Sequence, residues 1–374
     1  MTARIALRDF AAIDAELGDE LRAAVSAVAT SGRFILGEVV ADFEAAMAQH
    51  HGVPEAVALA SGTDALILTL EASGIGAGDR VVTTPLSFVA TSEAILRVGA
   101  EPCFVDVTPE GGMSPTALAT GLDQLRAAGE PAAAVLPTHL FGRSADGLVE
   151  VAAAHRIPVI HDAAQAVGAR IEGRPSGATG PACLSFSPSK NLGAWGDGGM
   201  VLSDDPDLVA DLRARREHGG WARGPARCVG VNSRLDAIQA AVLQVKLRHL
   251  ARHDAARHRV AGALLAGLEG LVGLELPAAP RPHDAPSSFT LRVTDGRRDA
   301  LASALHDAGI ESRVYYPRLL ADEPTCAQAR RLDDLVTARR LTAQVLTIPS
   351  HAYLDDGQID RIIGAIRSHF PAGS

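Results

Sequence analysis

Residues 185–199 read SFSPSKNLGAWGDGG and place one lysine, Lys190, in a loop of serine and glycine between two apolar runs. The runs CLSF (183–186) and GMVLSDD (199–205) both have the character of strands, so the lysine lies at a strand end, where a side chain is presented to ligands. A lysine amine must be neutral to form a Schiff base with an aldehyde, and partial burial lowers its pKa toward that state. The alternative is an exposed lysine in a polar loop, the ordinary fate of this residue type.

Strand-like and helical runs alternate on the N-terminal side of this loop. The pattern predicts strands at 56–61, 79–85, 102–107, 133–142 and 157–165, and helices at 64–74, 87–99, 114–129 and 148–155. Two further helices, at 19–30 and 38–52, are separated by the apolar loop GRFILG (32–37). Such alternation predicts an α/β fold with a mostly parallel sheet covered by helices.

The C-terminal side of the loop predicts a second, smaller α/β domain. A charged helix at 206–220 and a loop of Gly, Arg and Pro at 219–231 lead to a long helical run at 232–268. Within that run, apolar residues recur at helical spacing, and we place the domain boundary there, dividing residues 1–245 from 246–374. Beyond it we expect a strand at 288–293, a helix at 297–309, a short strand at 310–317, and two helices separated by residues 345–354.

Composition limits the classes of function. The 374 residues suit two domains, and 35 Lys and Arg are dispersed among 44 Asp and Glu, for a net charge of −9, which argues against nucleic acid as the main partner. The N-terminus has no secretory pattern, and no run has the length of a membrane span, so no membrane partner is expected. A cytoplasmic location is favoured by four cysteines that are far apart and form no CxxC pair: Cys103, Cys183, Cys228 and Cys326.

Three stretches converge at the carboxyl ends of the strands, where open α/β sheets bind ligands. Gly62 and Thr63 open a helix whose free N–H groups suit a phosphate, although an ordinary N-cap has the same pattern. Asp162 ends a strand, where a carboxylate can hold a proton on a pyridine nitrogen; Gln165 follows at a distance that reaches a ring hydroxyl if a helical turn has begun. The alternative is that Asp162 caps a helix at 163–169. Ser185 can donate to a phosphate or form an ST-turn.

Other ligand motifs are absent or wrongly ordered. There is no GxxxxGK[ST] phosphate loop, and GIGAGD (74–79) follows a helix and precedes a strand, the reverse of a dinucleotide fingerprint. His249 and His253 share a helix face among arginines, which suits a solvated basic surface better than a metal site. We therefore expect no metal.

Five ordered motifs resemble those of one known family: SGTDAL, LSFVAT, HDAAQAVGA, SFSPSKNLGAWGDGG and NSRLDAIQAA. The chain resembles the DegT/DnrJ/EryC1/StrS family of sugar aminotransferases, which depend on pyridoxal 5'-phosphate (PLP), from residue 32 to about 245 and more faintly to the end. The resemblance implies fold type I, with a mostly parallel seven-stranded sheet flanked by helices and a small C-terminal α/β domain. It also implies a homodimer with shared active sites, a nucleotide-linked keto sugar as substrate, and glutamate or glutamine as amino donor.

The resemblance assigns roles to matching positions. Lys190 matches the lysine that binds the cofactor covalently and transfers protons, Asp162 the partner of the pyridine nitrogen, and Gln165 the contact to the ring oxygen. Phe88 matches the aromatic that stacks on the ring, and Asn232 an asparagine that reaches the phosphate from the neighbouring subunit. The positions that match phosphate contacts are Gly62, Thr63 and Ser185.

Two further stretches bear on the substrate. The form KNLGA-GDGG resembles the branch that acts on 3-keto sugars for secondary metabolites or surface glycans. The family usually has YP-x-PLH in the small domain, whereas this chain has Tyr316-Pro317-Arg318-Leu319-Leu320 and then no histidine. A keto-inositol is therefore retained as an alternative substrate. Two less favoured alternatives are a sugar dehydratase, whose relatives have histidine in place of Lys190, and a non-catalytic regulatory homologue.

Overall fold

One large sheet forms the centre of the protein. The computed structural model describes residues 4–370 and contains two hydrogen-bonded runs of strands, β10-β3-β2-β4 and β5-β6-β7-β1. Parallel bridges between Val135 and Val159 and between Thr138 and Asp162 join the two runs into one sheet. The strands are β1 (Glu55–Leu59), β2 (Arg80–Thr83), β3 (Glu101–Phe104), β4 (Ala134–Leu136), β5 (His161–Asp162), β6 (Ala182–Ser185), β7 (Gly199–Ser203) and β10 (Arg330–Arg331).

Only β7 runs against its neighbours in this sheet. It pairs antiparallel with both β1 and β6, whereas β10, β3, β2 and β4 pair parallel, as do β5 and β6. The expected mostly parallel sheet of seven strands, β1 to β7, is therefore confirmed. The pairing of β10 with β3 adds a short edge strand from the C-terminal part of the chain.

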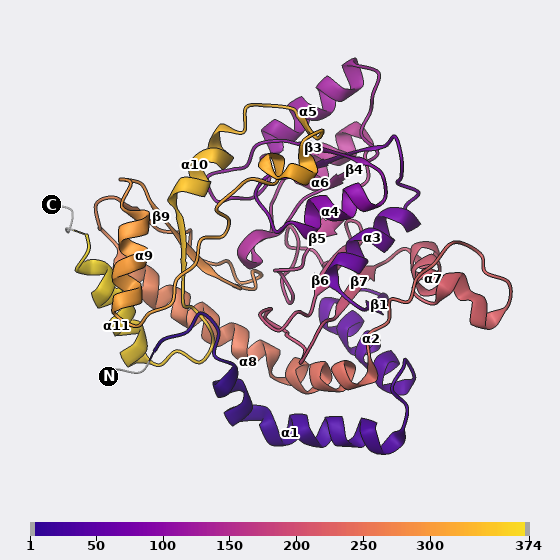
Figure 1. The fold of residues 1–374 in the computed structure, drawn as a ribbon, viewed down its shortest axis with the longest axis horizontal. Coiled ribbons are helices and arrows are strands. Elements are labelled where there is room, and N and C mark those ends of the chain that lie inside the picture. Colours follow the sequence, from indigo (N-terminus) through magenta and orange to yellow (C-terminus); the bar gives the residue numbers. More distant parts are fainter. Residues whose placement is uncertain (1–3, 371–374) are drawn as a thin grey trace.

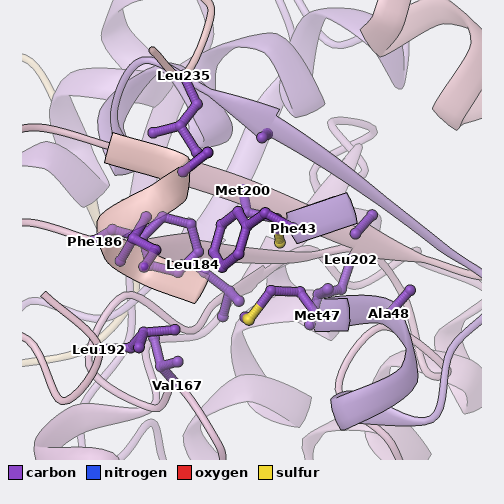
Figure 2. Packing of buried hydrophobic residues seen from close by; sticks show 14 of the residues in the cluster. Phe43, Met47, Ala48, Val167, Leu184, Phe186, Leu192, Met200, Leu202 and Leu235 are labelled. Carbon is purple, nitrogen blue, oxygen red and sulfur yellow. The ribbon is translucent and has the colours of Figure 1, made fainter. Parts of the chain in front are cut away.

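Helices cover both faces of the sheet because its strands alternate apolar side chains between two cores. In β7, Met200 and Leu202 belong to one core and Val201 to the other. The first core includes α2 (Glu38–His51), where the ring of Phe43 packs edge-on against Phe186, with centroids 5.4 Å apart (Figure 2). The other helices around the sheet are α3 (Gly62–Ala72), α4 (Ala90–Arg97), α5 (Pro115–Ala127), α6 (Leu148–His155) and α7 (Pro206–Arg215).

The long helix α8 (Ala237–Leu268) extends from the large sheet to a small antiparallel one, and α1 (Phe10–Ser31) lies along it (Figure 1). Leu243 of α8 packs in the core beside the large sheet, whereas Leu264 packs in the core of the small sheet. The small sheet has the order β11-β9-β8. Its elements are β8 (Leu274–Glu275), β9 (Phe289–Val293), β11 (Val345–Ile348), α9 (Arg298–Asp307), α10 (Val336–Gln344) and α11 (Asp356–Arg367).

Two segments pack in a core other than the one expected from the boundary near residue 245. Ile5 lies in the core of the small sheet and forms a parallel bridge with Ile310. Conversely, Leu320 and Leu335, which lie beyond the boundary, pack with Leu86 and Phe104 beside the large sheet. The boundary near residue 245 falls within α8 and stays a prediction.

Two expected elements are wrong. Residues 310–317 form no strand, because Ile310 pairs with Ile5 and Arg313 with Thr347, so the segment has isolated bridges to two partners instead of one continuous ladder. Residues 163–169 form turns instead of the helix that Asp162 was alternatively expected to cap. Among the described residues, no helix is long and apolar enough to cross a membrane.

Candidate active site

A cavity of about 780 Å³ opens where the central strands end and the small sheet faces them. Its walls come from the start of α3, the end of β6, the Lys190 loop and residues 313–318. The structure brings seven of the residues chosen from the sequence to this one cavity: Gly62, Thr63, Phe88, Asp162, Gln165, Ser185 and Lys190.

One end of the cavity is formed by the N-terminus of α3 against the end of β6. Ser61 caps the helix by accepting a hydrogen bond of 3.1 Å from the N–H of Asp64, and the N–H groups of Gly62 and Thr63 lack partners within the helix. A Cβ added at Gly62 would lie 2.7 Å from Cβ and 3.2 Å from Cα of Ser185, so only glycine allows the helix this close to the strand. The free N–H groups, the positive end of the helix and the Ser185 hydroxyl form a cradle suited to a phosphate.

Asp162 is a buried carboxylate in the middle of the cavity wall. The hydroxyl of Thr91 donates to its Oδ2 over 2.7 Å, and the N–H of Ala164 donates to Oδ1 over 3.2 Å. Burial raises the pKa of Asp162, and these hydrogen bonds and the charge of Lys190 only partly offset that effect. A cationic ring nitrogen would restore the compensation that this buried carboxylate lacks.

Lys190 faces the same cavity in a half-buried position. Burial lowers its pKa, Asp162 acts in the opposite direction, and Arg8 lowers the pKa further. Burial thus disfavours charge on Lys190 and Asp162 alike, and it outweighs their mutual attraction. Lowering the pKa in this way increases the share of the neutral amine, the form that acts as a nucleophile and a proton acceptor.

Gln165 and Phe88 complete the wall. The side-chain oxygen of Gln165 accepts from the N–H of Phe141 over 3.0 Å, and its amide nitrogen donates to the hydroxyl of Tyr316 over 3.1 Å. Gln165 therefore reaches the cavity from a turn, without the helical turn on which its placement depended. The ring of Phe88 is 56% exposed at the cavity, which leaves an aromatic face free for stacking.

Asn232 lies elsewhere. It is exposed and pairs with Glu217 in an isolated antiparallel bridge, and the cavity lining of this chain does not include it. Its placement agrees with a residue that serves another subunit, and that role stays a prediction.

Three contributors to the cavity were not found in the sequence. Thr91, in the first turn of α4, supports Asp162 from behind the cavity wall, and Phe88 lies just before that helix; the sequence does not mark the contact of Thr91 with Asp162. Tyr316 belongs to the stretch noted for its missing histidine, but its contact with Gln165 spans 151 residues. Arg8 reaches the cavity from the N-terminal segment, and no sequence pattern marks it.

Known proteins resemble the whole chain. A family model described as the DegT/DnrJ/EryC1/StrS aminotransferase family matches residues 15–367. The chain is 40% identical over 368 residues to UDP-N-acetyl-3-dehydro-alpha-D-glucosamine 3-aminotransferase of Acidithiobacillus ferrooxidans, with 97% of each protein covered. It is 39% identical over 374 residues to dTDP-3-amino-3,4,6-trideoxy-alpha-D-glucose transaminase of Streptomyces venezuelae, covering 98% of this chain and 96% of that protein. The crystal structure of S. venezuelae DesV in complex with a ketimine intermediate has a TM-score of 0.92 and 37% identity, covering 98% of this chain and 99% of that one.

Proposed function

The chain belongs to the DegT/DnrJ/EryC1/StrS aminotransferase family, and from this premise we propose that it aminates a nucleotide-linked 3-keto-deoxysugar with glutamate or glutamine as donor. Aminotransferase activity and dependence on PLP come with the family. One observation carries the proposal: Lys190, with a lowered pKa, and Asp162, with a raised one, face a single cavity that also has a phosphate cradle.

The described residues fit PLP. Gly62, Thr63 and Ser185 would hold its phosphate, because the missing Cβ at residue 62 leaves room at the N-terminus of α3. Asp162 is placed to pair with the pyridine nitrogen, and Phe88 offers a face to the ring. When bound, PLP supplies an aldehyde and an electron-withdrawing ring.

The residues around the cavity have separate roles in proton transfer. Lys190 would hold PLP through its aldehyde carbon, and its amine, when free, would accept the proton of the substrate carbon and return it. Asp162 would keep the ring nitrogen of PLP protonated, and Thr91 holds that carboxylate in place through a hydrogen bond of 2.7 Å. Gln165, fixed between Phe141 and Tyr316, would orient the ring hydroxyl of PLP.

The choice of a 3-keto sugar rests on two supports. The stretch around Lys190 has the form KNLGA-GDGG, and the relatives from A. ferrooxidans and S. venezuelae are named for 3-amino sugar chemistry on UDP- and dTDP-linked substrates. Arg313 and Arg318 are exposed at the cavity, where guanidinium groups suit the diphosphate of such a substrate. The product would be an amino sugar for a secondary metabolite, such as an antibiotic, or for a surface glycan.

We also propose a homodimer with shared active sites. Several large apolar side chains are exposed around the start of α8: Phe34 is 47%, Ile35 49% and Trp195 45% exposed. They lie close together because both segments are hydrogen-bonded to the first turn of α8. The carbonyl of Phe34 accepts from the N–H of Ala237, and the N–H of Trp195 donates to the side chain of Gln239. A second copy that covers this apolar surface would bury it and bring Asn232, five residues before α8, to the neighbouring phosphate. The free cysteines support a reducing, cytoplasmic location.

A keto-inositol is the second candidate substrate, because position 321, where the family pattern has histidine, is a buried alanine. The test mixes the purified yellow protein with glutamate or glutamine, and then with a panel of nucleotide-linked keto sugars and keto-cyclitols. Loss of the yellow absorbance with a donor and its recovery with a 3-keto nucleotide sugar is the expected result. Recovery with cyclitols alone would favour the second candidate, and no response to any donor would favour a non-catalytic homologue.

A further inference from the structure

Three cations hold the loop that carries Lys190. Nε of Arg8 donates to the carbonyl of Ser189 over 2.9 Å, Nη2 of Arg257 to that of Asn191 over 3.4 Å, and Nζ of Lys246 to that of Gly193 over 2.5 Å. The loop therefore presents alternate carbonyl groups to Arg8, Arg257 and Lys246, which we call the loop cations. Each bond fixes a backbone position within three residues of Lys190.

Arg8 differs from the other two loop cations in its surroundings. Arg257 pairs with Asp254 at 2.7 Å, and Lys246 lines only a smaller cavity on the α8 side of the loop. Arg8 lines both that cavity and the large one. Within residues 4–370 the hydrogen bonds of its guanidinium go to neutral oxygens only, those of Ser189, Leu7, Ser287 and Ser288. None of these hydrogen bonds pairs its positive charge with a carboxylate.

Contacts of the preceding residues with residues 309–311 fix the position of Arg8. Residues 4–8, which we call the N-terminal strap, run beside residues 309–311: the N–H of Ile5 donates to Gly309 over 2.8 Å, and that of Leu7 to Glu311 over 2.9 Å. Arg4 adds an ion pair with Glu311 at 2.7 Å. Arg8 then bridges from this strap to Ser287, 2.6 Å from Nη2, at the start of β9.

We propose that Arg8 is a positioning residue that ties the Lys190 loop to the small sheet and disfavours the ammonium form of Lys190 in the large cavity. A guanidinium that is hydrogen-bonded only to neutral oxygens beside a lysine disfavours the ammonium form, and its bonds to the carbonyl groups of Ser189 and Ser287 hold the loop that carries the lysine. The lowering of the pKa of Lys190 by Arg8 agrees with this geometry. The inference rests on the proposed role of Lys190 and holds for any keto substrate.

Other ionisable groups line the two cavities beside Lys190 and remain in place when Arg8 is replaced. On the cavity side these are Asp162, Asp197, Arg313, Tyr315, Tyr316 and the Arg318–Glu323 pair. On the α8 side they are Asp9, Lys246, His253, Arg257, His351 and Tyr353. Asp162 is the group that opposes Arg8, because it raises the pKa of Lys190.

The test measures the pKa of Lys190 in the full-length protein freed of cofactor. Lys190 is acetylated with acetic anhydride across a range of pH, and the extent of labelling is read by peptide mass spectrometry. Arg8→Met and Arg8→Gln should move the labelling midpoint to higher pH and slow labelling at neutral pH by about tenfold, the effect of one pKa unit. Arg8→Lys, which keeps the charge, should retain the wild-type midpoint.

Lys246→Met is the matched control, because it removes a cation from the same loop but not from the large cavity. Its midpoint should remain that of the wild type, even where thermal unfolding detects a looser loop. The proposal is overturned if both neutral Arg8 variants keep the wild-type midpoint, or if Lys246→Met shifts it equally. Should no amino donor react with the loaded protein while the Arg8 shift persists, the proposed function fails and this inference stands.

Discussion

Gly62 is the residue on which the phosphate cradle depends. In Gly62→Ala the new methyl would lie 2.7 Å from Cβ of Ser185 and 3.2 Å from its Cα, so α3 or β6 must shift. Overpacking of this kind typically costs about 1–3 kcal/mol, and here the displaced groups are the ones that would hold the phosphate. We expect PLP to bind on the order of tenfold more weakly, measured by fluorescence titration of the cofactor-free protein.

Gly262→Ala is the control for this substitution. Gly262 lies within α8 with no atom within 4 Å of an added Cβ, so alanine should stabilise the protein by about 0.5–1 kcal/mol without changing PLP affinity. Equal PLP affinity in Gly62→Ala and the wild type would show that the contact between α3 and Ser185 has no part in binding.

Asp162 should weaken the cofactor-free fold while it serves the site. Its pKa is raised by burial, so the charged carboxylate costs stability at neutral pH, and this cost disappears as the pH falls through the raised value toward that of an unfolded aspartate. Asp162→Asn should therefore leave the cofactor-free protein at least as stable as the wild type at pH 7, with the advantage shrinking in acid. Thermal unfolding at several pH values measures this.

The same variant should lose transamination, because an amide cannot compensate a protonated ring nitrogen. A clear fall in the melting temperature of cofactor-free Asp162→Asn at pH 7 would contradict the pKa direction. It would mean that hydrogen bonds from Thr91 and Ala164 outweigh the effect of burial.

At the scale of the elements, a buried ion pair joins α2, β1 and the end of α7. Nη1 of Arg216 lies 2.5 Å from Oε1 of Glu44 and 2.9 Å from the carbonyl of Ala58, while Glu44 accepts the N–H of Ala58 over 2.8 Å. Glu44→Gln keeps an acceptor for that N–H but leaves the buried guanidinium with only the longer contact of Glu217, 3.9 Å from its Nε, as counter-charge. We expect a loss of about 3–5 kcal/mol in the free energy of unfolding, measured by urea denaturation.

Glu20→Gln provides the comparison, because its ion pair with Arg248 is exposed on both sides. Exposed pairs of this kind contribute little, so the urea midpoint should stay at the wild-type value. If the two variants shift the midpoint equally, burial of the Glu44–Arg216 pair does not set its importance.

The elements that were correctly predicted are those whose pattern is local. The strands β1 to β7 and helices such as α3 and α8 follow from apolar runs and helical spacing in the segments themselves. The strand β10 consists of two arginines, and only its pairing with Cys103 and Phe104 makes it a strand. The strand predicted at 310–317 is absent because the partners of this segment are not local. Ile310 pairs with Ile5, about 300 residues earlier, and Arg313 pairs with Thr347, later in the chain.

The residues of the candidate site also divide into those with a local sequence signal and those without one. Lys190, Asp162 and Gly62 were found because each lies at a strand end or helix start within a recognisable motif. Arg8 was missed because its contacts with Ser189 and Ser287 depend on how distant carbonyl groups are oriented. A residue whose side chain carries the chemistry can be recognised from its type and motif. A contact to a backbone oxygen is hard to predict, because every residue has a carbonyl group.

At the scale of the whole molecule, the proposed dimer predicts complementation between two inactive variants. Lys190→Ala lacks the lysine, and Asn232→Ala lacks the residue proposed to cross the interface. In a mixed dimer one site combines both defects, while the other has an intact Lys190 and an intact Asn232. Random mixing makes half of the dimers hybrid, with one good site of two, so activity should recover to about a quarter of the wild-type value.

The measurement is the transamination rate after the two proteins are unfolded and refolded together. Each variant refolded alone serves as the control. Recovery to the sum of the separate activities and no more would contradict a site shared between subunits, even if a dimer forms.

The N-terminal strap sets an order of events during synthesis. Ile5 docks on Gly309 and Ile310, so residues 4–8 are synthesised about 300 residues before their partners and must wait for them. At translation rates of roughly 5–20 residues per second, that wait lasts on the order of 15–60 s. The Lys190 loop, complete in sequence long before, gains its Arg8 contact only then. A nascent chain that has stalled before residue 309 holds the whole Lys190 loop but lacks the contacts that position Arg8 against it.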